Sequence, residues 1–545
     1  MSFFLGGLAA GAIAITVSLL LRLFAGGLFI PELASQTLFS LTPGQVESQA
    51  VETLGPLAKY SAFIGSVAAN LILYGLIGLL VGSLQKKKKR LLSEGYVLNA
   101  ILSSVVAYII LLMISALLLA LTETNVQAKL DSIKFLAIYL VPANIAFGFT
   151  LSSFYERIVL FHRRPLTMAT KKEDTITTGK EEIDYKKRLV LRAGIASAVA
   201  LPILYFGLNS LLVPKKEVQQ LSPSLSALLG SKPIPPGFEN PKLRSLVESE
   251  ITPTDLFYRI DKNPVVPEVN AQTWNLSMKG LVDNPFKINY KELRDMPSIE
   301  QFATLECVSN KIGGDLISTA IWKGVRLKDL LEKAHVKPTA KYIVFRCFDG
   351  YDVGIPLERG LLEGTILAYD MNGAPLTSEH GYPVRAIVPG IYGMMNAKWM
   401  TEIELVDKAY EGYWQRKGWS NIAKYNTHSF IIIPGNAPIR KRFRKLEEAS
   451  NANRTVPVAG MAFAGDRGIL KVEVSTDGGT TWKTAKIKDP LSQYTWVLWN
   501  AELDLTGSNI HKIVVRATDK TGIIQTDQIQ DPFPNGATGY HIVNL

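Results

Sequence analysis

Cysteine is nearly absent from this sequence, which has two, Cys307 and Cys347, in 545 residues. So few thiols exclude a disulfide scaffold, and they exclude zinc or iron–sulfur sites built from clustered thiolates. The Cys-x-x-Cys-His motif of covalent haem attachment does not occur either. These absences leave the distribution of apolar and charged residues as the first guide to the architecture.

Charged residues and histidines are missing from the centres of the long apolar runs. Five runs are long enough to cross a hydrocarbon core of roughly 30 Å as helices. They extend from about Phe3 to Ile30, Tyr60 to Leu84, Tyr96 to Leu121, Phe135 to Tyr155 and Ala193 to Val213. They do not alternate apolar and polar residues as barrel strands do, so we predict five transmembrane helices.

The functions open to these helices are limited by what they lack. All six histidines lie outside the runs, which disfavours a haem held between helices. Runs two to five have no charged residue at their centres, which disfavours a transport or channel function. We expect the helices to anchor the chain in the lipid bilayer, with docking of a quinone or a partner subunit as the alternative.

Positive charge lies beside the apolar runs, and this sets the predicted orientation. The net charge of +11 is concentrated in Lys86 to Arg90 and in the stretch from Arg157 to Arg192, whereas residues 31–56 have no Lys or Arg. By the positive-inside rule the N-terminus is cytoplasmic in a multi-pass protein of the cell membrane, and everything after Val213 is extracytoplasmic. Arg22, near the outer end of the first run, is an exception whose side chain can reach the interface. The pattern does not predict nucleic-acid binding.

One basic segment has two interpretations. Residues 187–192, Lys-Arg-Leu-Val-Leu-Arg, resemble a lysine–arginine variant of the twin-arginine export motif, a route that carries folded proteins. The alternative is a group of positive charges flanking the fifth helix.

Composition changes after the fifth run. Residues 214–240 are rich in proline and predict an extended, semi-rigid linker. In residues 241–445 short strand patterns alternate with short helical ones, which predicts an α+β domain.

The remaining residues, 455–545, have an all-β pattern. Residues 471–475 alternate strictly, Asp477-Gly478-Gly479 supplies a hairpin turn, and Trp482 begins the return strand. Short strands over this length predict an immunoglobulin-like sandwich. The predicted fold class is therefore multi-domain, with the five-helix transmembrane domain over residues 1–213 preceding the linker, the α+β domain and the sandwich.

The segment from Thr304 to Val325 carries the most chemical information. Taken alone, Cys307 is a thiol between an apolar strand and a Gly-Gly turn, and such a cysteine is usually a small buried hydrophobe. Lys311 close by, and glycines that let the backbone approach a bulky group, favour a ligand instead. Cys347 lies in an alternating strand and is expected in the core. A disulfide between the two would exclude metal ligation.

Several ordered motifs surround this cysteine. They comprise Cys307-x-x-Asn310, residues 318–322, 368–376, 380–390 and 397–399, with residues 257–261 and 274–280 upstream and 465–478 and 536–541 downstream. Together they resemble the sulfite oxidase family of molybdopterin-dependent oxidoreductases over residues 240–545. The resemblance implies a molybdenum–molybdopterin cofactor (Moco) in the α+β domain and a sandwich of the dimerisation type.

The family resemblance also implies roles for individual residues. Cys307 matches the cysteine that ligates molybdenum, and Arg259 matches an arginine near the metal that can hold an oxyanion. The residues expected to bind the cofactor are Arg259, Asn310, Lys311, His380, Arg385 and Lys398. Arginine and lysine suit the phosphate of molybdopterin because they supply permanent positive charge.

Three positions depart from the family pattern. Asp261 replaces a histidine, Ile312 replaces an arginine, and Trp419 stands where sulfite oxidases have a tyrosine near the metal. Indole donates one hydrogen bond but cannot act as a phenol does, so Trp419 is a catalytic candidate with altered chemistry. The pocket is also less cationic than a sulfite site should be. Sulfite dehydrogenation, an uncharacterised oxidation, and reduction of an S-oxide or N-oxide all stay open.

The predicted function is two-electron oxygen-atom transfer on a small-molecule substrate, with electrons passing to or from a separate carrier or membrane redox partner. A homodimer is expected because the sandwich domain mediates dimerisation in soluble relatives. A cofactor-less, membrane-tethered binding protein is the non-enzyme alternative, and metal analysis distinguishes the two.

Overall fold

The computed structural model describes residues 2–25, 29–54, 57–88, 96–122, 126–163, 235, 237–263, 266–434, 455–504 and 512–544. The chain divides into two compact units, one of Met1–Thr42 with Ala50–Lys215 and one of Pro43–Gln49 with Lys216–Leu545. In the described residues the first unit is helical, and the second contains sheets with short helices.

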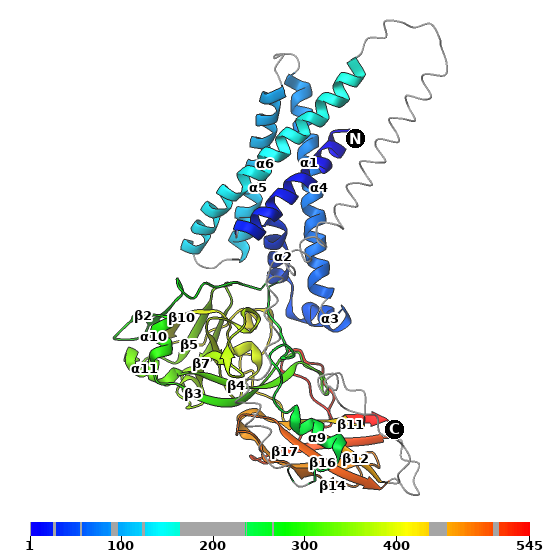
Figure 1. The fold of residues 1–545 in the computed structure, drawn as a ribbon, viewed down its shortest axis with the longest axis vertical. Coiled ribbons are helices and arrows are strands. Elements are labelled where there is room, and N and C mark those ends of the chain that lie inside the picture. The colour runs from blue at the N-terminus through cyan, green and yellow to red at the C-terminus, as the bar shows by residue number, and fades with distance from the viewer. Residues whose placement is uncertain are drawn as a thin grey trace, which may run out of the picture. The chain divides into compact units, whose positions relative to one another are not determined.

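The first unit is built from long apolar helices. They are α1 (Ser2–Ala25), α4 (Leu57–Lys88), α5 (Tyr96–Thr122) and α6 (Val126–Arg163), with the shorter α2 (Ile30–Leu41) following α1. The residues of α3 (Gly44–Leu54) are divided between the two units. α6 packs along α5 and α1, and α1 packs along α4 (Figure 1). A Cβ atom on Gly78 of α4 would lie 2.7 Å from the Cα of Gly7 in α1, so glycine lets these two backbones approach closely.

Four of the five predicted spans coincide with helices long and apolar enough to cross a membrane. These segments are Phe3–Arg22, Ser61–Leu84, Tyr96–Leu121 and Leu136–Phe154. The fifth, residues 193–213, lies outside the described residues, as do the twin-arginine-like segment and most of the Pro-rich linker, so the count of five stays a prediction. The sequence did not predict α2 and α3. α2 brings Glu32 to 2.9 Å from Arg22, which gives that exceptional arginine a partner.

The α+β part of the second unit contains a mixed sheet and an antiparallel sheet. The mixed sheet has the order β2 (Phe286–Asn289), β1 (Asn275–Gly280), β10 (Met400–Val406), β5 (Tyr342–Cys347), β6 (Asp352–Pro356), in which β1 and β10 are parallel. The other has β3 (Ile299–Glu306), β4 (Ile317–Arg326), β7 (Ile366–Met371), β8 (Ala374–Pro375), with β9 (Arg385–Ile387) paired to β7. The short helices are α9 (Pro241–Glu248), α10 (Tyr290–Asp295), α11 (Leu327–Ala334), α12 (Leu357–Gly360), η1 (Ser378–His380), η2 (Gly393–Met395) and η3 (Gln415–Lys417). The predicted α+β class is confirmed.

The C-terminal strands form two further sheets. One has the order β11 (His428–Ile433), β12 (Thr455–Phe463), β16 (Val497–Asp504), β15 (Lys486–Ile487). The other has β14 (Lys483–Thr484), β13 (Ile469–Ser475), β17 (Lys512–Asp519), β18 (His541–Asn544), and η5 (Gly465–Arg467) precedes β13. Both sheets contribute to one apolar core that includes Val458 and Trp499 from the first and Val472 and Val515 from the second.

The predicted hairpin is present, because β13 pairs with β14 across a turn in which Asp477 accepts backbone N–H groups of Thr480 and Thr481. β11 shares a sheet with β12, so this strand joins the C-terminal domain although it precedes the boundary expected near residue 445. The immunoglobulin-like classification of the sandwich stays a prediction.

Candidate functional site

Cys307 opens the loop between the antiparallel strands β3 and β4. Its backbone N–H donates to the carbonyl of Leu316 at 2.9 Å, and its own carbonyl accepts from the Asn310 N–H at 3.0 Å. The Asn310 side chain closes the loop, since its Oδ1 accepts the Leu316 N–H at 3.0 Å and its Nδ2 donates to Glu306 Oε1 at 2.9 Å. A Cβ on Gly314 would collide with that Oδ1, which explains glycine there.

The Cys307 thiol is buried and free, and its Sγ lies 3.0 Å from Ser309 Oγ. Burial raises the pKa of the thiol, so without a ligand it stays protonated at neutral pH. A bound high-valent metal would displace that proton. Cys347 is also free and lies in the main apolar core, as predicted, so the disulfide that would exclude metal ligation is not formed.

Arg385, in β9, is a buried cation whose described contacts leave donor capacity unused. Its guanidinium donates to the carbonyls of His380 at 3.2 Å and Asn396 at 3.5 Å, and lies 5.0 Å from the Trp322 ring. Within the described residues, Nε has no hydrogen-bond partner and no carboxylate is within ion-pair distance. Burial lowers the pKa of Arg385 to about 10, which still leaves it charged at neutral pH. A buried, uncompensated guanidinium is the environment that an anionic group such as a phosphate would occupy.

His380 lies beside this arginine at the end of η1. Its Nε2 is 2.9 Å from the carbonyl of Thr254, and since a carbonyl only accepts, this nitrogen carries the hydrogen. Burial lowers the pKa of His380 to about 3, with nearby Arg385 and Lys398 contributing, so the ring is neutral. It can bind a cofactor by hydrogen bonding but supplies no charge.

Lys398 and Arg259 share one carboxylate. Asp261, the residue that replaces the family histidine, is buried, and its Oδ2 lies 3.0 Å from Arg259 Nε and 3.4 Å from Lys398 Nζ. The lysine also donates to the Glu379 carbonyl at 3.2 Å. The substitution therefore places a negative charge between two cations, Arg259 and Lys398, which makes this side of the site less positive than a histidine there would.

Phe257 and Tyr258 connect the cysteine loop with the cationic side. The Phe257 ring centroid is 5.4 Å from that of His380, and the Tyr258 N–H donates to Ser318 Oγ in β4 at 3.1 Å. The Tyr258 hydroxyl lies against Gly393, which also adjoins the Glu306 carbonyl. The structure thus brings the predicted residues Arg259, His380, Arg385 and Lys398 together, and it places Asn310 beside Cys307 on the loop.

The remaining two candidates, Lys311 and Trp419, come from other segments of the chain. Lys311 is exposed on the cysteine loop. Trp419 is buried after η3, where its ring packs edge-on against Phe533 at 5.1 Å, and its Nε1 has no hydrogen-bond partner among the described residues. That N–H is available to a ligand, and its catalytic role stays a prediction.

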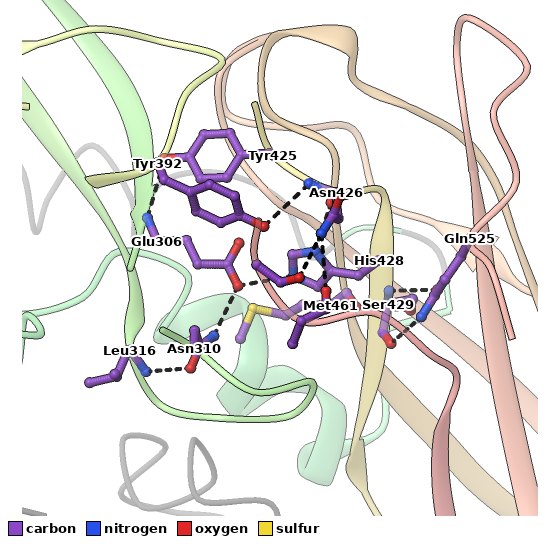
Figure 2. Close-up of polar contacts among 12 residues, drawn as sticks. Glu306, Asn310, Leu316, Tyr392, Tyr425, Asn426, His428, Ser429, Met461 and Gln525 are labelled. Carbon is purple, nitrogen blue, oxygen red and sulfur yellow. Dashed lines mark hydrogen bonds and ion pairs between the residues drawn. The ribbon is translucent and has the colours of Figure 1, made fainter. Parts of the chain in front are cut away.

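Sequence reasoning gave no role to Glu306 and did not identify His428. Both are buried, and Glu306 Oε1 lies 3.5 Å from His428 Nε2 (Figure 2). Burial raises the pKa of Glu306, while His428 and Asn310 oppose that shift. Glu306 could have been singled out from the sequence, because it is a carboxylate at the end of a predicted apolar strand and directly precedes Cys307. Nothing local linked it to a histidine so distant along the chain.

Comparisons with known proteins match the α+β and C-terminal parts of the chain. Residues 263–414 match the model for the oxidoreductase molybdopterin binding domain, and residues 420–531 match that for the Mo-co oxidoreductase dimerisation domain. Sulfite oxidase from Arabidopsis thaliana is 27% identical over 343 residues, which cover 53% of this chain and 86% of that protein. Mitochondrial sulfite oxidase from Macaca fascicularis is 30% identical over 321 residues, covering 52% and 59%.

Other relatives cover the same part of the chain. The NADH nitrate reductase of Hordeum vulgare is 30% identical over 370 residues, which are 56% of this chain and 39% of that enzyme. The crystal structure of the sulfane dehydrogenase SoxCD from Paracoccus pantotrophus aligns with a TM-score of 0.47 and 25% identity, over 54% of this chain and 83% of that one. The chain thus spans little more than half of the mammalian mitochondrial relatives.

Proposed function

Because this chain carries a molybdopterin oxidoreductase of the sulfite oxidase type, with a molybdenum cofactor implied, we propose that Cys307 ligates the metal and that Arg385 binds the anionic end of the cofactor. Support for Cys307 comes from its free, buried thiol on a loop fixed by Asn310. The observation that carries the proposal is the buried Arg385 guanidinium, which lacks a carboxylate among the described residues.

The described residues fit the cofactor. His380 offers a neutral ring beside Arg385, Lys398 adds a cation, and Arg259 is partly exposed and suited to an oxyanion. The cofactor supplies two-electron oxygen-atom transfer, while the chain binds, orients and shields it. The substrate proposed is a small molecule, and Asp261 argues for one that needs less positive charge than sulfite does.

We further propose that the first unit anchors the enzyme in the cell membrane, with its catalytic part outside the cytoplasm. α5 supports this because it exposes an apolar stripe at intervals of four residues, formed by Val97, Ile101, Val105, Ile109, Met113, Leu117 and Leu121. An apolar face of this kind is stable against lipid tails. Electrons then pass to or from a separate carrier or membrane partner. The dimerisation-type domain supports a homodimer.

Metal analysis tests the proposal. The full chain, purified in detergent from a host that makes molybdopterin, should contain about one molybdenum per chain, and Cys307→Ser should remove it. Cys347→Ser is the matched control because it changes the other buried free thiol. Absence of molybdenum from the wild type, or full occupancy in Cys307→Ser, would contradict the assignment.

A substrate screen then identifies the reaction. Sulfite, S-oxides and N-oxides are offered to the molybdenum-loaded chain with an artificial electron acceptor or donor. Turnover of any one of them, lost in Cys307→Ser, supports the enzyme. A loaded chain that turns over none of them would exclude sulfite, S-oxides and N-oxides as its substrates.

A further inference from the structure

A buried contact between the carboxyl group of Glu306 and the imidazole of His428 lies next to the cysteine loop. Glu306 is the last residue of β3 and His428 is the first of β11, with exposed fractions of 4% and 3%. Glu306 Oε1 accepts from Asn310 Nδ2 at 2.9 Å and lies 3.5 Å from His428 Nε2 (Figure 2). The other ring nitrogen of His428 is 3.0 Å from the carbonyl of Asn426, so Nδ1 carries a hydrogen and Nε2 is directed at the carboxylate.

The C-terminal domain holds this strand end at more than one atom. The Glu306 N–H donates to the hydroxyl of Tyr425 at 3.3 Å, while Tyr392 accepts the N–H of Asn426 at 3.4 Å (Figure 2). His428 and Tyr425 both belong to the segment that matches the dimerisation domain, residues 420–531. Gly313, inside the cysteine loop, has φ +79°, and a Cβ there would lie 2.5 Å from His541 Nε2 of β18.

An apolar pair would be the simpler way to fill this space. Removing a carboxylate and an imidazole from water costs several kcal/mol per charge, and apolar replacements of similar volume are often neutral or stabilising. A polar contact retained next to the cysteine therefore fits orientation better than stability. Residues behind a metal ligand commonly set its position.

We propose that Glu306 and His428 are positioning residues that fix the Cys307 loop, so that the C-terminal domain helps to build the metal site. This inference rests on the proposed function, because it assumes that Cys307 binds the metal. The contacts among Glu306, His428 and Asn310 are present whether or not it does. Glu306 acts through Asn310, whose amide holds the far side of the same loop at Leu316. His428 keeps the Glu306 carboxylate directed toward that amide.

Three variants separate hydrogen bonding from packing. Glu306→Leu keeps the volume but removes both contacts, and His428→Phe keeps a ring but removes its side of the pair. Glu306→Gln keeps the contact that holds the loop in neutral form, because its Oε1 can still accept from Asn310 Nδ2, and it leaves a polar group beside His428. Glu250→Leu is the matched control, since Glu250 is a buried glutamate paired with Lys488 of the C-terminal domain at 2.9 Å.

The first measurement needs no cofactor. In cofactor-free chain with the Cys347→Ser background, the rate of Cys307 alkylation by iodoacetamide reports how firmly the loop is held. Glu306→Leu and His428→Phe should raise the rate about tenfold, whereas Glu306→Gln and Glu250→Leu should leave it unchanged. Equal rates in all variants, with differences only in melting temperature, would mean a purely structural role and overturn the proposal.

The second measurement uses the molybdenum-loaded chain. The electron paramagnetic resonance signal of the one-electron-reduced metal should change in Glu306→Leu and His428→Phe and be restored in Glu306→Gln. If one apolar variant fails to fold, the other is measured alone, and an unaltered signal there counts against the proposal. A wild type without molybdenum would refute the proposed function, while the alkylation result would still decide whether the pair positions the loop.

Discussion

At the scale of single residues, the candidate site contains polar and ionisable groups that are buried away from water. Arg385 is a permanent cation in an apolar setting, and Cys307 is a thiol that burial keeps protonated. The buried charge of Arg385 costs stability in the empty protein, and if Arg385 and Cys307 bind the cofactor as proposed, the bound anion and metal would compensate that cost. Site residues of this kind should therefore affect the cofactor-free and loaded chains differently.

Arg385→Met tests that difference. In the cofactor-free chain it removes an uncompensated charge but also two hydrogen bonds to carbonyls, so the free energy of unfolding should change by no more than about 1 kcal/mol. In the loaded chain, molybdenum content should fall at least about tenfold. Urea unfolding and metal quantitation provide the two measurements. A loss of several kcal/mol without cofactor would show that Arg385 is structural.

His380 predicts a specific pH dependence of the cofactor-free chain. Its pKa is lowered by burial to about 3, below the 6.5 of a solvent-exposed histidine, so the unfolded chain binds a proton that the folded chain does not. Its contribution to stability is therefore full above pH 6.5 and is lost as pH falls toward 3, by up to about 1.4 kcal/mol per pH unit.

His380→Gln should flatten the fall in unfolding free energy between pH 6.5 and 4.5, as measured by urea unfolding. His335→Asn is the control, because His335 is exposed at the end of α11 and adopts φ +52°, which asparagine tolerates. Parallel pH profiles of wild type and His380→Gln would contradict a neutral, buried His380.

At the scale of elements, sequence patterns predicted the strands and turns that are determined by neighbouring residues. The alternation of residues 471–475 predicted a strand, and the Gly-Gly turn after it predicted the hairpin. Pairing between distant segments was not predictable: the contact of Glu306 with His428 depends on how β3 and β11 meet in three dimensions. α2 and α3 were missed because they lie in a short stretch that was interpreted only as a connection between spans.

The β3–β4 loop gives an element-scale prediction. Asn310→Ala leaves the N–H of Leu316 and the carboxylate of Glu306 without their amide partner, so the chain should lose about 1–3 kcal/mol of unfolding free energy. Molybdenum occupancy should fall as well. Asn275→Ala is the control, since that asparagine is exposed in β1 and bonds a neighbouring carbonyl. Equal unfolding free energies for the two variants would contradict a closing role for Asn310.

At the scale of the whole molecule, the prediction concerns which side of the membrane each part occupies. Four helices are apolar enough to span, and the basic stretch Lys86 to Arg90 follows the second candidate span, Ser61–Leu84. If positive charge sets the topology, that stretch is cytoplasmic and the catalytic part is outside. The chain should then stay with membranes after carbonate washing and dissolve in detergent.

Single cysteines at two positions decide the orientation. In a Cys347→Ser background, where Cys307 is buried, Lys87→Cys marks the basic stretch and Lys520→Cys marks an exposed position of the C-terminal domain. In intact cells stripped of any outer barrier, a membrane-impermeant maleimide should label position 520 and label position 87 only after lysis. Labelling of position 87 in intact cells, with position 520 protected, would place the catalytic part in the cytoplasm. A cytoplasmic catalytic part would not need export, so residues 187–192 would then be only positive charges beside the fifth predicted helix.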